Sequence, residues 1–169
     1  MIARIRRRLQ SERGFTLVEL LVVVMIIGIL AAIGYTVFLG QKQKANDAGA
    51  KDAAAALNVD VSSCHVDNGD YSQCATAVQI GDPSLKIDTG VTAANNCTAE
   101  PSGTDIIYPK PESGKVAVVA ASVDCYIIAA VSNDGHMFWE IKRAGSSVTH
   151  TCDPAGQGGC TVDGTWNRA

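Results

Sequence analysis

The sequence predicts an α+β fold in which a long N-terminal α-helix, transmembrane in its first half, packs against a C-terminal antiparallel β-sheet. Three observations predict this fold. Residues 20–39 carry no charge, an Ala-rich stretch with dispersed charges continues to about residue 60, and strand-like runs follow residue 115. The chain has 169 residues, and about 125–130 of them follow the apolar run, which is enough for one modest core.

Basic residues are concentrated at the N-terminus. Five of the 14 Lys and Arg residues lie in the first 14 positions, whereas the chain after Gly14 has nine basic and 16 acidic residues, a net charge of −7. A basic cluster that flanks an apolar run keeps that end of the chain in the cytoplasm. A nucleic-acid-binding surface would need a clustered basic stripe, so no nucleic-acid partner is predicted.

The apolar run has the length of a membrane span. As a helix, residues 20–39 would extend roughly 30 Å, close to the thickness of the hydrocarbon core. Glu19 stands at the start of this run, where a carboxylate is costly and requires a partner. A secretory signal peptide cleaved after Ala32-Ile33-Gly34 would have an unusually long apolar part. Neither that interpretation nor a plain signal anchor explains Glu19.

The string RGFTLVELLVVVMIIGILAAI, which begins at Arg13, explains all of these features together. It resembles the N-terminus of type IV prepilins and of the related type II secretion pseudopilins. The resemblance implies a prepilin leader peptide, residues 1–14, which a membrane peptidase removes by cutting after Gly14. The same peptidase would then methylate the new N-terminal residue, Phe15. Phe15, Thr16 and Glu19 match the positions that serve assembly in this family.

Elementary electrostatics gives Glu19 a role in such a filament. Cleavage creates a cationic α-amino group on Phe15, and the Glu19 carboxylate of an incoming subunit can lie beside the Phe15 amine of its neighbour. The two buried charges largely compensate each other, whereas any other register leaves one of them unpaired. In a lone precursor, Glu19 can instead extend to the lipid headgroups, and the two roles belong to different stages.

The resemblance implies a structural subunit of a type IV pilus-like filament, with no catalytic residues and no cofactor. Its expected partners are copies of itself, the prepilin peptidase, and the pilus assembly platform with its ATPase. The precursor would cross the cytoplasmic membrane once with its N-terminus inside, and the assembled filament would be extracellular. One alternative is a pseudopilin of a type II secretion system or a minor pilin. An alternative from another class is a signal-anchored ectodomain enzyme.

The predicted organisation has three parts after the leader. Residues 15–39 form the transmembrane or filament-core helix, residues 40–63 continue this helix in solution, and residues 64–169 form a globular head with a variable loop and an antiparallel sheet. In the soluble part, a thin stripe is expected to pack under the sheet; its members are Ala45, Ala48, Ala56 and Val59. Many pilins have Pro where this chain has Thr36, so bending or melting of the helix near Gly34 is left open.

The strands are predicted from residue 115 onward. Two apolar runs, 115–123 and 125–132, precede the hairpin turn signal Asn133-Asp134-Gly135, and alternation continues to residue 143. Residues 146–152 and 160–166 are expected to add short strands. The segment from Cys64 to Cys74 is predicted to be a loop, because Asn68-Gly69 is a turn signal.

Six cysteines follow the apolar run, and their even number indicates disulfides in an oxidising compartment. They permit 15 pairings. Short loops would be closed by Cys64–Cys74 and by Cys152–Cys160, and the family resemblance favours the second of these. Cys97 and Cys125 would then pair by elimination, and the other pairings stay open at this stage.

Sites for metal or nucleotide chemistry are not predicted. The three histidines, His65, His136 and His150, lack zinc-ligand spacing, and no P-loop or G-x-S-x-G motif is present. Type II pseudopilins can bind calcium in a C-terminal loop. Asp153 and Asp163 could offer oxygen ligands there, but their spacing matches no recognisable calcium loop.

Overall fold

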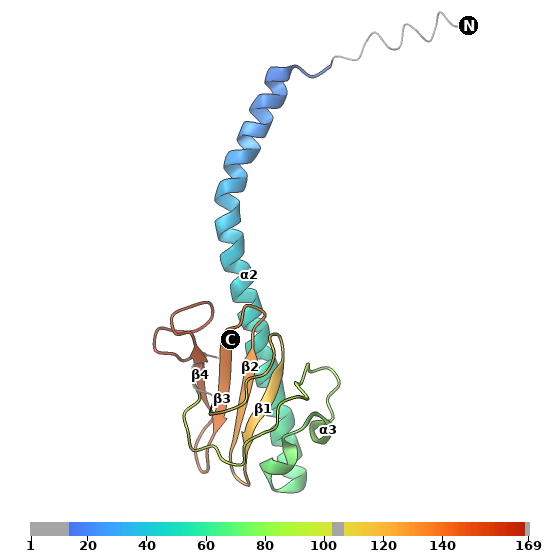
Figure 1. Cartoon of the computed structure of the whole chain (residues 1–169), viewed down its shortest axis with the longest axis vertical. Helices are drawn as coiled ribbons and strands as arrows, with labels where there is room; N and C mark the ends of the chain where they lie inside the picture. Colours follow the sequence, from blue (N-terminus) through green and yellow to red (C-terminus); the bar gives the residue numbers. More distant parts are fainter. Residues whose placement is uncertain (1–13, 103–106, 168–169) are drawn as a thin grey trace, which may run out of the picture. The chain divides into compact units, whose positions relative to one another are not determined.

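The structure, a computed structural model, describes residues 14–102 and 107–167. Its elements, shown in Figure 1, are α2 (Leu17–Asn68), η1 (Tyr71–Cys74), α3 (Ala77–Ile80), β1 (Val116–Ala121), β2 (Tyr126–Val131), β3 (Met137–Lys142) and β4 (Thr149–Asp153). A long helix and a four-stranded antiparallel sheet confirm the predicted α+β, pilin-like fold. The chain divides into two compact units, and the boundary in the sequence falls between Leu39 and Gly40. The predicted leader, except Gly14, lies outside the described residues.

Helix α2 is longer than predicted. It runs without a break through Gly34 and ends at Asn68, not near residue 63. The prediction of a loop from Cys64 onward was therefore wrong for its first five residues, 64–68. The turn signal itself marks the end of the helix, because Gly69 adopts φ 72° and its N–H donates to the His65 carbonyl at 2.7 Å. A left-handed glycine at this position is a common helix terminator.

The sheet has the strand order β1-β2-β3-β4, and each pair of neighbouring strands in it is antiparallel. The predicted hairpin is confirmed, since β2 and β3 flank a turn in which Gly135 has φ 90°. The predicted strand at 160–166 was wrong. In this segment only Thr165 forms a bridge, to Thr151. The Thr161 N–H donates to the Thr165 carbonyl at 2.9 Å, so the segment closes on itself as a turn.

The face of α2 that packs on the sheet differs from the predicted stripe. Ala45 and Ala48 are exposed, as is Val59. The buried positions recur at helical spacing and include two polar residues; they are Asp47, Ala50, Ala54, Leu57, Asn58 and Val61. The prediction failed because it ranked positions by apolarity alone. Asp47 and Asn58 can be buried because the rest of the head supplies their hydrogen-bond partners.

Both faces of the sheet are covered. Phe138, Tyr126 and Ile128 lie in the cluster that contains the buried residues of α2. On the other face, Trp139 and Ile141 pack with residues of the long segment between α3 and β1, among them Tyr108. The sheet is thus the middle layer between α2 and this segment, which explains why β1, β2 and β3 are buried at nearly every position.

A buried polar network crosses the contact between α2 and the sheet. Glu140 of β3 has no exposed surface, and its carboxylate accepts a hydrogen bond from the Asn58 side-chain amide. The Tyr126 hydroxyl donates to Asn58 Oδ1 at 2.8 Å. The His150 Nε2 atom lies 3.4 Å from Glu140 Oε1. Because buried carboxylates are stable only when they are paired, this network fixes how the helix sits on the sheet.

The segment between α3 and β1, described for residues 81–102 and 107–115, is called the covering segment below. It is held together by Asp88, whose side chain is 7% exposed. One carboxylate oxygen accepts the Glu112 N–H at 2.8 Å and the other accepts the Gly90 N–H at 3.0 Å. The bond from Glu112 is the main cause that lowers the pKa of Asp88, opposed by burial and assisted by Gly90 and Lys115. A carboxylate bound in this way joins the beginning of the segment to its end, in front of β1, and so closes the segment into a loop.

We expect acid to weaken this closure. A lowered folded-state pKa means that Asp88 stabilises the fold above its unfolded pKa of about 3.9, and that this contribution is lost as the pH falls through the folded-state value. Asp88→Asn should lower the unfolding free energy by about 1–3 kcal/mol at neutral pH and by less at acidic pH. Urea unfolding of the detergent-solubilised chain at both pH values measures this. The exposed Asp67→Asn is the control, and an equal loss at both pH values would contradict the prediction.

Candidate assembly site at the start of α2

Gly14, Phe15 and Thr16 precede the first turn of α2, and Thr16 is the residue directly before the helix. The Thr16 hydroxyl accepts the Glu19 N–H at 3.2 Å. In return, Glu19 Oε2 accepts the Thr16 backbone N–H at 3.3 Å and the Thr16 hydroxyl at 3.2 Å. This reciprocal arrangement is a capping box, which satisfies N–H groups that the first turn of a helix leaves unpaired.

The structure therefore gives Glu19 an intramolecular partner that sequence reasoning missed. The signal was present as Thr-x-x-Glu in front of an apolar run, the usual pattern of a capping box. The negative charge also lies at the positive end of the helix dipole. The capping box explains how the carboxylate is accommodated in a single chain, and it leaves open the pairing with a second copy that was predicted from the sequence.

The first unit has an almost entirely apolar surface. Every side chain from Phe15 to Leu39 that the structure describes is exposed, including Phe15 at 85%. By length and composition, α2 is the one described helix that could cross a membrane. An apolar helix without a protein partner needs lipid or other apolar helices around it. Glu19 is the only charged side chain among the described residues of this unit.

Three disulfides lie in the second unit. Cys64 of α2 is bonded to Cys74 of η1, Cys97 of the covering segment to Cys125 in front of β2, and Cys152 of β4 to Cys160. Each bond closes a loop of the head, and the described residues include no free cysteine. In general, such bonds stabilise a small domain by about 2–4 kcal/mol each.

Each of the three histidines contacts another side chain of the head. His65 lies in α2 and stacks on Tyr71, with ring centroids 3.8 Å apart. His136 lies 2.9 Å from the buried Asp47 carboxylate, and His150 lies near Glu140. Residues 14–102 and 107–167 contain no group of three or more His, Cys, Asp or Glu side chains that could hold a metal ion.

The fold and the start of α2 are those of a pilin-like structural subunit, and comparisons with known proteins agree. Residues 9–35 match the family model described as the prokaryotic N-terminal methylation motif. The type II secretion system core protein G of Escherichia coli K12 is 30% identical over 129 residues, which cover 70% of this chain and 86% of that protein. The protein of the same name from Klebsiella michiganensis is 36% identical over 72 residues, 43% of this chain and about half (51%) of that protein.

No solved structure matches the chain. The match to the E. coli protein covers most of both chains, and the methylation motif includes Gly14, Phe15, Thr16 and Glu19. This chain therefore belongs to the family of type IV pilins and type II secretion pseudopilins.

Proposed function

We propose that this protein is processed after Gly14, methylated on Phe15 and assembled into a helical filament through its apolar helix. One observation carries the proposal: Glu19 is a lone carboxylate at the start of an exposed apolar helix, four residues from the chain end that cleavage would create. Before assembly, Thr16 satisfies this carboxylate. In the filament, the Phe15 amine of a neighbouring copy takes over and sets the register between subunits.

In this proposal the parts of the chain act in order. Residues 1–14 are the leader, residues 15–39 anchor the precursor in the cytoplasmic membrane and later form the filament core, and the head is presented outside. Prepilin peptidase, an assembly platform with its ATPase, and further copies of the chain are the partners. Head-to-tail contacts between copies do not close, and such contacts generate filaments.

The filament we favour is the pseudopilus of a type II secretion system, because both relatives carry that system in their names. A type IV pilus is the second candidate. Its support is the C-terminal loop closed by Cys152–Cys160, since such a disulfide loop is common in pilins. A strain that lacks the gene separates the two: loss of protein secretion into the medium supports the pseudopilus, and loss of long surface fibres with normal secretion supports the pilus.

The mature N-terminus tests the processing step. We expect the N-terminal peptide of the protein, isolated from membranes or sheared fibres, to begin at Phe15 and to carry one additional methyl group. Peptide mass spectrometry measures this directly. A peptide that begins at Tyr35 would indicate a secretory signal peptide, and one that begins at Met1 a signal anchor; either result contradicts the proposal. Gly14→Val, which places a branched side chain at the expected cut, should block cleavage and serves as the control.

A further inference from the structure

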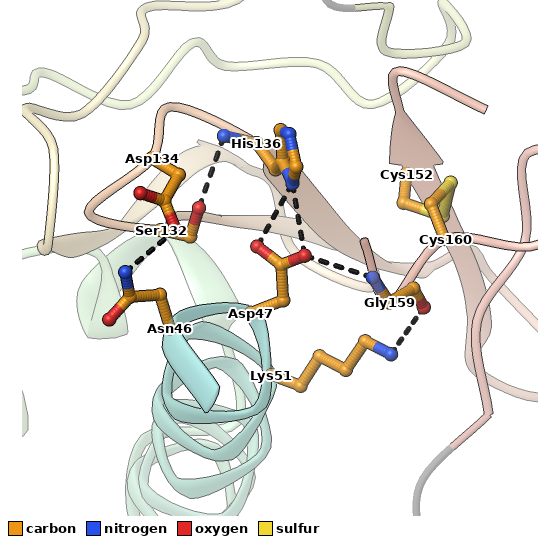
Figure 2. A network of polar contacts seen from close by, with 9 residues as sticks. All are labelled: Asn46, Asp47, Lys51, Ser132, Asp134, His136, Cys152, Gly159 and Cys160. Carbon is orange, nitrogen blue, oxygen red and sulfur yellow. Dashed lines mark hydrogen bonds and ion pairs between the residues drawn. A yellow bond between two sulfur atoms is a disulfide. The ribbon is translucent and has the colours of Figure 1, made fainter. Parts of the chain in front are cut away.

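Figure 2 shows that Gly159, in the loop between Cys152 and Cys160, contacts two side chains of α2, Asp47 and Lys51. The Gly159 N–H donates to Asp47 Oδ2 at 2.9 Å, and the Gly159 carbonyl accepts a hydrogen bond from Lys51 Nζ at 2.5 Å. Asp47 and Lys51 lie one helical turn apart, on the same face of α2. A negative and a positive side chain therefore bind the two polar groups of a single residue, and hydrogen bonds to charged groups are the stronger kind.

The carboxylate at this contact is fully buried, and other donors support it. Asp47 has no exposed surface, and His136, which follows the β2–β3 turn, places Nδ1 2.9 and 3.0 Å from the two Asp47 oxygens. Asn46 directly precedes Asp47 in α2, and its side-chain amide donates to the carboxylate of Asp134, in the same β2–β3 turn, at 2.7 Å. Helix, hairpin turn and loop thus meet at one carboxylate, which is stable in the interior only while these partners remain.

Aromatic rings hold the ammonium group in place. Lys51 Nζ lies 5.2 Å from the centroid of the Phe138 ring and 5.7 Å from that of the Trp166 ring. Both distances are within the range of cation–π attraction. Phe138 belongs to β3 and Trp166 to the C-terminal segment, so Lys51 is positioned by the folded head and not by the loop alone.

The loop can approach this closely only because positions 158 and 159 are both glycine. Gly158 adopts φ +55°, and a Cβ atom added there would overlap the Asp47 carboxylate. A Cβ atom on Gly159 would lie 2.7 Å from Lys51 Nζ and 3.3 Å from Asp47 Cβ. The sequence Gly158-Gly159 is therefore required by the contact with α2, not only by the flexibility of the loop.

We propose that Asp47 and Lys51 form an electrostatic anchor that holds the Cys152–Cys160 loop on α2, independently of the disulfide and without a metal ion. The disulfide limits the length of the loop, and the anchor fixes its position. Calcium, which pseudopilins can bind in a C-terminal loop, does not fit here, because the Lys51 ammonium already occupies the Gly159 carbonyl and would repel a cation. Asp153 and Asp163 do not come together with a third acidic side chain in the described residues.

Hydrogen–deuterium exchange of the full chain in detergent tests the anchor, with the peptide that contains residues 155–161 as the readout. Asp47→Asn keeps the shape of the side chain and removes its charge. It should speed exchange of this peptide by at least about tenfold while the disulfide stays intact, since a hydrogen bond to a charged group is lost. Asp52→Asn makes the same charge change on the exposed side of α2 and should leave exchange unaltered. Peptides from β2 report whether the fold survives.

Reduction and chelation complete the test. With Asp47 and Lys51 in place, the peptide should stay protected after a reductant opens Cys152–Cys160 and after EDTA treatment. Should Asp47→Asn fail to fold, Lys51→Met leaves the buried carboxylate and its donors in place. It removes the bond to the Gly159 carbonyl together with the cation–π contacts, and it should also speed exchange of this peptide. The proposal is overturned if reduction or EDTA alone releases the loop, or if neither variant changes its exchange more than Asp52→Asn does.

Discussion

Glu19→Ala should leave the chain cleaved after Gly14 but should reduce its recovery in sheared filaments by more than about a hundredfold. Removing one partner of a buried ion pair costs about 3–5 kcal/mol, and each 1.4 kcal/mol is a factor of ten. In this variant the Phe15 amine of each neighbour would be buried without its counter-charge. The measurement is quantitative immunoblotting of sheared filaments and membranes, with mass spectrometry of the N-terminus to verify cleavage.

Glu19→Gln separates the two roles that the carboxylate could have. Gln at the third helical position can still complete the capping box with Thr16, but it cannot neutralise an amine. If the intermolecular charge pair sets the register, Glu19→Gln should fail in assembly about as severely as Glu19→Ala. If the capping box alone matters, Glu19→Gln should assemble normally, and the proposed pairing with Phe15 would then be wrong.

Asn58→Ala should be among the most destabilising single changes in the head. It removes the amide that donates to Glu140 and the oxygen that accepts from Tyr126. The Glu140 carboxylate, which has no exposed surface, would lose a buried partner. We expect a loss of about 3–5 kcal/mol and a fall in Tm of roughly 6–20 °C. Thermal unfolding of the detergent-solubilised chain, followed by near-ultraviolet circular dichroism, measures the change.

Two further variants make this prediction specific. Asn95→Ala truncates an exposed asparagine of the covering segment and should leave Tm nearly unchanged. The double variant Asn58→Leu/Glu140→Leu replaces the buried polar pair by apolar side chains and should recover most of the lost stability, because buried ion and polar pairs are often no more stabilising than well-packed apolar ones. If Asn58→Ala proved as stable as Asn95→Ala, the network would not be what holds α2 on the sheet.

The local signals of this sequence were reliable where the chain itself decides the structure. The turn at Asn133-Asp134-Gly135 needs a glycine with positive φ, and the structure has it at Gly135. The strands on either side of this turn could be read from their apolar runs. The Asn68-Gly69 signal marked a true helix end, although the segment from Cys64 to it was wrongly predicted as a loop. These features depend on backbone conformation and on neighbours close in sequence.

The sequence by itself determined the class of this protein: an uncharged helix long enough for a membrane, one carboxylate at its start, and a head made of a helix and an antiparallel sheet. Only the tertiary structure decided which face of α2 is buried, because Asp47 and Asn58 become acceptable in the interior through partners 68 to 112 residues away in the chain. Apolarity can be read from a single position, whereas the burial of a polar side chain depends on whether a distant group completes its hydrogen bonds.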